Sequence, residues 1–323
     1  MSNKLLKVIQ LIIIIILVYF FISKIDINNF LLKFNFNFFI AILIVQVPLF
    51  ISIFLTAYRH LYFVNNPNLN FSIALKAIII GTGFNYILPG RISELLKATY
   101  IRDKCNISLG VGVGSVFLER FTDLIVVAFL GLVSIVFFAL DFNIYLALSI
   151  LGIALLIIII VIYYEEYILS MIQRIIKWKT LQDLIKNIFT HIHQQLNKEK
   201  LFYGLLQGIT IWFFSALTVG VFMNIAGDLE FNTIAVITLL IGGAIGLAIP
   251  ALPGGLGTFE AVAVVVMMKF GYDFDTAIAL AIGLRLSNMI LILPIALILS
   301  TKNGTGLYKA ISGFRKRDKQ DHE

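Results

Sequence analysis

Long apolar runs separated by short polar segments dominate the chain. Runs such as Leu5 to Ile22, Phe38 to Leu55 and Ile144 to Tyr163 approach the roughly 20 residues that a helix needs to cross a bilayer. They lack the strict apolar/polar alternation of barrel strands. The pattern predicts an all-α integral membrane protein with about six full transmembrane helices, near residues 5–22, 38–58, 107–139, 143–164, 202–224 and 275–299. Residues 107–139 could form one long kinked span or two.

Two further apolar segments are interrupted by proline and glycine. Residues 71–103 break at Pro89, Gly90 and Arg91, and residues 233–270 break between Pro250 and Gly257. Proline removes a backbone donor and glycine loosens the chain, so each segment is predicted to be two half-helices. The second arms, of about 12 to 13 residues, reach only about 18 to 20 Å, too short to cross comfortably. We therefore expect two re-entrant helical hairpins, whose returning arms begin near the candidate N-caps Ser93 and Thr258.

The two hairpins form an internal repeat. Glu94 is followed by Arg120 after 26 residues, and Glu260 is followed by Arg285 after 25 residues. Three residues beyond each arginine comes a polar residue, Asp123 in one copy and Asn288 in the other. Because the flanking spans are expected to run in opposite directions, the hairpins are predicted to be oppositely oriented, in an inverted repeat of the kind that places a transporter site near the bilayer midplane.

Loop charges predict the orientation. The basic residues lie in short loops beside apolar spans, so the net charge of +7 indicates membrane topology and not nucleic-acid binding. The loop at residues 59–70, with Arg59, and the basic segment 165–200 are predicted to be cytoplasmic, as are both termini. We expect one transmembrane domain over residues 1–323, multi-pass in the cell membrane, with a disordered basic tail at 312–323. The 165–200 segment, with Trp178, is either a helix lying on the anionic inner leaflet or a solvated linker.

Composition excludes several classes of function. With 60% hydrophobic and 13% charged residues, no ordinary soluble domain fits. A single cysteine and scattered histidines predict no disulfide and no metal site, and no nucleotide-binding loop or other cofactor motif is present. Glycine pairs with GxxxG spacing predict close helix packing, at Gly110/Gly114, Gly204/Gly208 and Gly242/Gly246.

Charged residues inside apolar runs are the candidate functional residues, since each costs at least about 2.5 kcal/mol unless it is paired or faces water. They either fix helix register as buried ion pairs or line a polar cavity for a charged substrate. Arginine suits a phosphate because its planar fork donates two hydrogen bonds at once. The predicted substrate-binding residues from this pattern are Arg91, Glu94, Glu119, Arg120, Asp123, Glu260, Arg285 and Asn288. The predicted hairpin breaks are Pro89, Gly90, Pro250, Pro253, Gly254, Gly255 and Gly257.

Three motifs carry a family resemblance: NYILPGRISE from Asn85 to Glu94, FLERFTD from Phe117 to Asp123, and PALPGGLGTFE from Pro250 to Glu260. They resemble the flippase-like membrane family that includes the transmembrane region of lysylphosphatidylglycerol synthases. The resemblance spans nearly the whole chain and adds Asn85 to the predicted substrate-binding residues. The residues that it implicates in function are Asn85, Pro89, Arg91, Glu94, Glu119, Arg120, Asp123, Pro253, Gly254, Gly255, Gly257, Glu260 and Arg285. Ser93 replaces the family's usual glycine, and Lys97 stands where an arginine is common. The full synthases carry a soluble aminoacyl-transfer domain after the membrane region; the resemblance here is to the flippase half alone, and we expect no such domain.

The leading hypothesis is a lipid translocase that moves an anionic or aminoacylated phospholipid, or a polyprenyl-phosphate lipid, between leaflets. Its partners would be membrane lipids with anionic headgroups, and a separate lipid-modifying enzyme is a candidate partner. One alternative is a membrane enzyme of lipid modification that uses Glu94 or Glu260 as general base; the sequence favours a non-enzymatic role because it has no nucleophile or donor-binding motif. Another is an ion- or proton-coupled solute transporter in which Glu119 and Arg120 relay charge.

Overall fold

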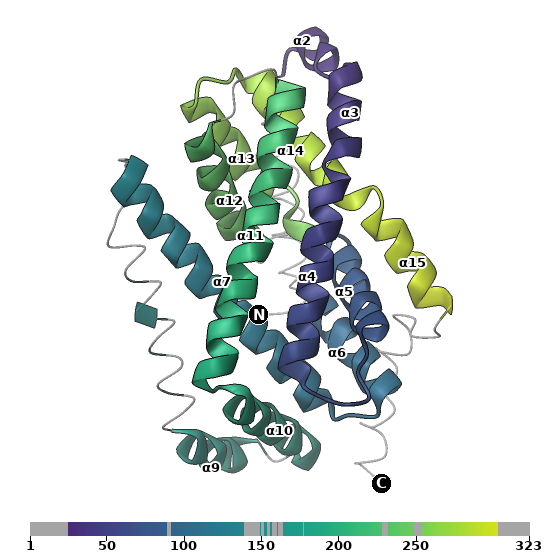
Figure 1. The fold of residues 1–323 in the computed structure, drawn as a ribbon, viewed down its shortest axis with the longest axis vertical. Helices are drawn as coiled ribbons and strands as arrows, with labels where there is room; N and C mark the ends of the chain where they lie inside the picture. The colour runs from purple at the N-terminus through teal and green to yellow at the C-terminus, as the bar shows by residue number, and fades with distance from the viewer. Residues whose placement is uncertain are drawn as a thin grey trace. The chain divides into compact units, whose positions relative to one another are not determined.

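The computed structural model describes residues 25–88, 92–138, 149, 152–153, 156, 160, 164–176, 178–227, 232–248 and 253–302. Every regular element in this part of the chain is helical (Figure 1). The helices are α2 (Ile27–Leu32), α3 (Phe36–Ile44), α4 (Gln46–Val64), α5 (Phe71–Asn85), α6 (Ile92–Cys105), α7 (Leu109–Phe138), α9 (Glu165–Ile175), α10 (Lys179–Gln195), α11 (Lys198–Gly227), α12 (Thr233–Ala248), η2 (Pro253–Gly255), α13 (Thr258–Lys269), α14 (Phe274–Met289) and α15 (Ile292–Lys302).

Within the described residues, three helical stretches are long and apolar enough to cross a membrane: Phe36–Val64, Lys198–Gly227 and Phe274–Thr301. They confirm the spans predicted near 38–58, 202–224 and 275–299. The predicted span at 5–22 lies outside the described residues, and the one at 143–164 lies largely outside them. Residues 109–138 form one 30-residue helix, α7, so the alternative of two spans there is wrong.

Both predicted helix interruptions are present. Helix α5 ends at Asn85 and α6 begins at Ile92; helix α12 ends at Ala248 and α13 begins at Thr258. Pro89, Gly90, Arg91 and Pro250 lie outside the described residues. At the second break, Gly254, Gly255 and Gly257 all have positive φ angles, between 61° and 80°, a backbone region that favours glycine.

The predicted N-caps are corrected by the structure. Helix α6 already begins at Ile92, one residue before Ser93, and the N-cap of α13 is Gly257. The Glu260 carboxylate accepts the Gly257 N–H at 2.8 Å, and Thr258 instead donates its hydroxyl to the Gly246 carbonyl. Glu260 can accept the Gly257 N–H because its side chain is long enough to reach back to the N-cap from the first turn of the helix.

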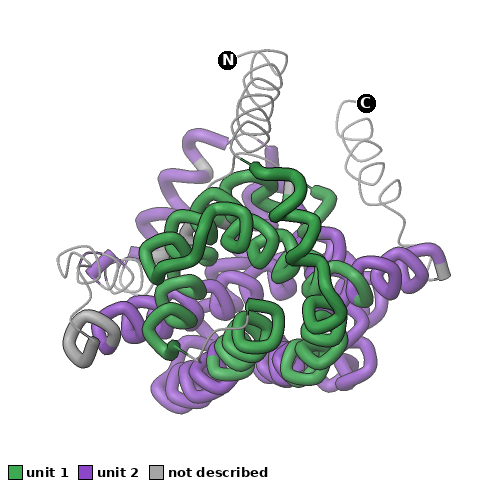
Figure 2. The backbone as a smooth tube through the Cα atoms, turned by 90° about the horizontal axis from the view of Figure 1, so that it is seen from above, with its two compact units in different colours: residues 1–51, 85–91, 213–291 green, residues 52–84, 92–212, 292–323 purple. Residues whose placement is uncertain are grey.

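The chain divides into two compact units, each described by itself. Unit 1 comprises residues 1–51, 85–91 and 213–291, and unit 2 comprises residues 52–84, 92–212 and 292–323 (Figure 2). The core of unit 1 contains Phe38, Phe222, Leu239 and Met267, all nearly inaccessible. Phe38 and Phe222 stack edge to face with centroids 5.6 Å apart, over Gly283, where a methyl group would overlap both rings.

Glycine pairs bring helices into close contact, as their spacing predicted. In unit 1, Gly242 faces Val262 and Gly246 faces Thr258, so α12 and α13 run antiparallel side by side. In unit 2, Gly110 and Gly114 of α7 lie against α10 at Asn187 and His191 (Figure 1).

The 165–200 segment therefore contains two helices and is not a solvated linker along its whole length. Helix α10 packs on α7 and buries His191 and Ile192. In α9, by contrast, Tyr167, Met171 and Ile175 are exposed.

Candidate functional site

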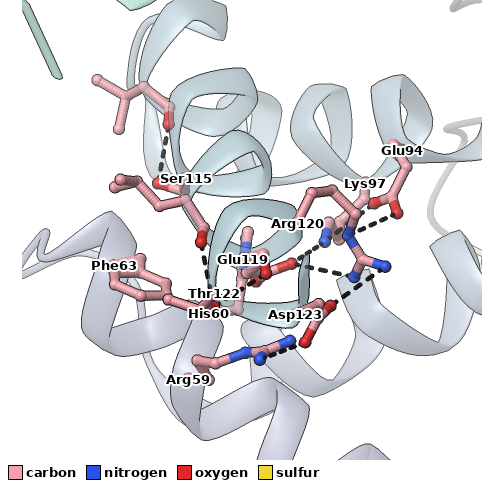
Figure 3. A network of polar contacts seen from close by, with 12 residues as sticks. Arg59, His60, Phe63, Glu94, Lys97, Ser115, Glu119, Arg120, Thr122 and Asp123 are labelled. Carbon is pink, nitrogen blue, oxygen red and sulfur yellow. Dashed lines mark hydrogen bonds and ion pairs between the residues drawn. The ribbon is translucent and has the colours of Figure 1, made fainter. Parts of the chain in front are cut away.

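Unit 2 holds a cluster of seven ionisable side chains from three helices (Figure 3). Helix α4 contributes two, α6 contributes two and α7 contributes three. The members of this cluster are Arg59, His60, Glu94, Lys97, Glu119, Arg120 and Asp123. The helical repeat explains the grouping, because residues one turn apart on α6 and on α7 share a helix face.

Glu119 is the centre of the cluster and is completely buried. Lys97 Nζ donates to Glu119 Oε2 at 2.7 Å, and His60 Nδ1 lies 2.5 Å from Glu119 Oε1. Lys97 also contacts Glu94, one turn earlier on α6, at 3.1 Å. A buried carboxylate needs such partners, because an unpaired charge there would be very costly. Glu119 thus joins α4, α6 and α7.

Asp123 makes a second junction. Arg59 Nη1 donates to Asp123 Oδ1 at 2.7 Å, and the indole N–H of Trp212 lies 3.4 Å from the same oxygen. Arg59 is 1% exposed. The loop predicted at residues 59–70 is wrong at its start, because α4 continues to Val64 and Arg59 is part of this helix. The signal that could have corrected this is the unbroken apolar pattern that continues past Arg59 and His60.

Arg120 differs from the other members of the cluster because three carboxylates surround its guanidinium group but none forms a short hydrogen bond with it. Its nearest carboxylate oxygens lie at 3.6 Å on Glu94, 3.8 Å on Glu119 and 3.4 Å on Asp123, all longer than a charge-assisted hydrogen bond. Its Nε atom is buried without a hydrogen-bond partner among the described residues. Its side chain is nevertheless 41% exposed. Three carboxylates orient this arginine and leave donors for another acceptor.

The charges of the cluster balance. Arg59, Lys97 and Arg120 supply three positive charges, and Glu94, Glu119 and Asp123 supply three negative ones. His60 decides the remainder: the total is zero when it is neutral and +1 when it is protonated. The charge state of His60 therefore decides whether the cluster is neutral or carries one positive charge.

Unit 1 holds the other predicted Glu/Arg pair. Arg285 Nε donates to Glu260 Oε1, and Nη2 donates to Glu260 Oε2 at 3.1 Å. Arg285 also donates to the carbonyls of Gly254, at 2.8 Å, and Gly255, at 3.0 Å. Since Glu260 in turn accepts the Gly257 N–H, the pair holds the Pro-Gly-Gly turn on both sides.

The repeat predicted from sequence is therefore matched by contacts, but the two copies are not equivalent. Glu94 lies beside Arg120 and Glu260 beside Arg285, each pair within its own unit. Arg285 makes four hydrogen bonds, two to Glu260 and two to the carbonyls of the turn, and is 9% exposed, whereas Arg120 has none of comparable length. Asp123 pairs with Arg59, whereas Asn288 bonds back to the Leu284 carbonyl of its own helix.

The remaining predicted residues and the missed ones complete the site. Asn85 is half-buried at the end of α5, and Arg91 lies outside the described residues. The sequence analysis missed Arg59, His60 and Lys97 as members of the cluster. Within the described part of the chain, no group of three His, Cys, Asp or Glu side chains is arranged to hold a metal ion.

A second buried histidine lies beside the cluster in unit 2. His191 Nε2 is 2.9 Å from Ser115 Oγ and 3.1 Å from the Phe63 carbonyl oxygen. Burial disfavours the charged imidazole and lowers the pKa of His191 to about 4. This histidine is therefore a neutral packing contact between α10 and α7 at neutral pH.

Comparison with known proteins gives one match. The family model for the lysylphosphatidylglycerol synthase TM region matches residues 7–296, which includes both helix interruptions and both Glu/Arg pairs. No curated protein and no solved structure matches the chain.

Proposed function

The chain belongs to the family of lysylphosphatidylglycerol synthase transmembrane regions, and from this premise we propose that it is a lipid translocase. It moves an anionic or aminoacylated phospholipid, or a polyprenyl-phosphate lipid, between the leaflets of the cell membrane. The lipid phosphate binds at Arg120, and the acyl or isoprenoid chains stay in the bilayer.

The observation that carries the proposal is the unused guanidinium of Arg120. A phosphate oxygen is the strongest common acceptor for an arginine fork, because it forms two parallel charge-assisted hydrogen bonds. The three carboxylates at 3.4–3.8 Å fix the fork without occupying it, so little ordering is required when a phosphate arrives. Glu94, which is 24% exposed, also suits an amino group on an aminoacylated headgroup.

The helix pairs supply the conformational change. We infer that α5–α6 and α12–α13 re-enter the membrane from opposite sides, as an inverted repeat whose rocking exposes the site alternately to each leaflet. Supporting this are the helix interruptions, the antiparallel packing of α12 on α13, and the short second arms of 14 and 12 residues. At about 1.5 Å per residue these arms reach only about two thirds of a bilayer.

Orientation follows from charge. With both termini cytoplasmic, the basic segment containing α9 and α10 lies on the inner side, where anionic lipids attract lysine and arginine. The exposed apolar face of α9 rests on that leaflet.

The decisive experiment reconstitutes the protein in vesicles that contain a trace of lipid with a fluorescent headgroup. Phosphatidylglycerol, lysylphosphatidylglycerol, phosphatidylcholine and a polyprenyl phosphate would be compared by dithionite quenching of the outer leaflet. We expect faster movement of at least one anionic or aminoacylated lipid than in empty vesicles. Movement no faster than in empty vesicles across all four lipids would refute the proposal.

A matched pair of variants assigns the site. Arg120→Ala should abolish the protein-dependent movement. Arg102→Ala is the control, because Arg102 is a similarly exposed arginine, at 38%, whose partner is the adjacent Asp103. If the two variants were equally active, the lipid phosphate would not bind at Arg120.

A further inference from the structure

We propose that the site takes up a proton together with the lipid phosphate, and that His60 Nε2 receives the proton. The inference rests on the proposed function, since it needs a phosphate at Arg120. It adds a coupling between lipid binding and pH that the translocase reading does not itself require.

The balance of charge is the first argument. With His60 neutral, the six other ionisable groups of the cluster cancel, and a monoanionic phosphate would leave a net charge of −1. Excess charge is costly among partly buried groups, because the surroundings screen it poorly. A proton bound at the same time restores neutrality.

His60 is the member of the cluster that can take this proton. Its Nδ1 faces Glu119 at 2.5 Å, and as a neutral tautomer it donates its one N–H there. Its Nε2 atom then carries an open lone pair, and it is buried with no hydrogen-bond partner among the described residues. The vacant base lies on the opposite side of the imidazole ring from the carboxylate network.

The charged groups around His60 explain why the proton binds together with the lipid. Glu119 on α7 and Glu94 on α6 carry negative charges that favour an imidazolium, whereas Lys97 on α6 carries a positive charge that opposes it. His60 is also fully buried, which opposes a charged imidazole. A phosphate bound at Arg120 adds a negative charge to the cluster and so favours protonation of His60.

Linkage makes the effect measurable. If lipid binding raises proton affinity, then lowering the pH must raise lipid affinity by the same coupling free energy. Complete uptake of one proton corresponds to about a tenfold gain in affinity for each unit fall in pH. In a vesicle, the same linkage would let a proton gradient drive lipid movement.

The test is calorimetric titration of dihexanoylphosphatidylglycerol into the protein in phosphatidylcholine nanodiscs, with empty nanodiscs subtracted. Repeating it at one pH in buffers of different ionisation enthalpy gives the number of protons exchanged per lipid bound. We expect net uptake approaching one proton between pH 6 and 8. Binding without proton uptake would overturn the inference and leave the proposed function intact, whereas no binding of this lipid, together with no movement of the four lipids in the vesicle assay, would overturn the proposed function itself.

Variants then locate the proton. His60→Gln keeps a side chain that can donate to Glu119 but cannot ionise, and we expect it to bind lipid without proton uptake. His193→Gln is the matched control, because His193 is an exposed histidine on α10. Persistence of proton uptake in His60→Gln would assign the proton elsewhere and overturn the inference. The wild-type proton count decides the coupling even if the His60 variant fails to fold.

Discussion

The backbone of Tyr86 lies directly against Gly254, within unit 1. A Cβ atom at Gly254 would come within 2.8 Å of the Tyr86 carbonyl oxygen, and the φ angle of Gly254 is +61°. The first residue of the first helix interruption thus touches the turn of the second, and both the contact and the conformation require glycine at position 254. We predict that Gly254→Ala lowers the free energy of unfolding by more than about 2 kcal/mol, measured by circular dichroism in detergent.

A second glycine separates the two effects. Gly271 also has a positive φ, +92°, but a Cβ there would meet nothing within 4 Å. Gly271→Ala should therefore show only the conformational cost, about 1 kcal/mol. Equal losses in the two variants would contradict the packing role of Gly254.

Arg285 is expected to act on stability more than on lipid contact. Its removal would leave Glu260 without its guanidinium partner and the carbonyls of Gly254 and Gly255 without a donor. Breaking a buried pair on one side costs about 3 to 5 kcal/mol. We predict a larger drop in melting temperature for Arg285→Ala than for Arg120→Ala, measured side by side. The reverse order would exchange the roles assigned to the two arginines.

The sequence predicted the elements with strong local signals. Apolar length identified three spans, proline and glycine located both helix interruptions, and the spacing of Glu94, Arg120, Glu260 and Arg285 foretold two pairs. The sequence could not predict how the two Glu/Arg pairs differ, because the difference depends on which side chains of other helices lie beside each pair.

Arg59 and His60, which α4 contributes to the cluster, show what the sequence could not predict. They interrupt an apolar run that resumes from Leu61 to Val64, so the sequence can indicate a continuing helix but not what the two side chains contact. Their burial results from packing of α4 against α7, which brings Asp123 and Glu119 to them. Contacts between residues about 60 positions apart in the chain leave no periodic trace in a single sequence.

His191 should make the α7–α10 contact sensitive to acid. Its pKa is about 4 in the folded protein and 6.5 when exposed, because burial disfavours the imidazolium. The contribution of neutral His191 to the free energy of unfolding is therefore fully present above pH 6.5 and is lost as the pH falls from 6.5 toward 4. The difference of 2.5 corresponds to about 3 kcal/mol.

Hydrogen exchange read by mass spectrometry on peptides of α10 measures this effect. We expect protection of residues 186–195 to fall between pH 6.5 and 4, after correction for the intrinsic rate. His191→Gln should flatten the pH dependence, and His193→Gln should leave it unchanged. A wild-type profile as flat as that of His191→Gln would contradict the role of burial.

Trp178 provides a probe of how α9 meets the membrane. Tyr167, Met171 and Ile175 lie on one face of α9 at four-residue spacing and are 64%, 44% and 71% exposed; Trp178 follows them and is 61% exposed. An apolar stripe flanked by Arg174 and Lys179 fits the boundary between headgroups and acyl chains of an anionic leaflet. We predict that lipids brominated near the headgroup quench Trp178. The Trp178→Phe variant, which leaves only Trp212, should lose this part of the signal.

Ile175→Glu should weaken the quenching because a carboxylate is repelled from that boundary, whereas Glu166→Gln, on an exposed position of the same helix, should not. Quenching of Trp178 no stronger than that by a soluble quencher alone would mean that α9 faces water.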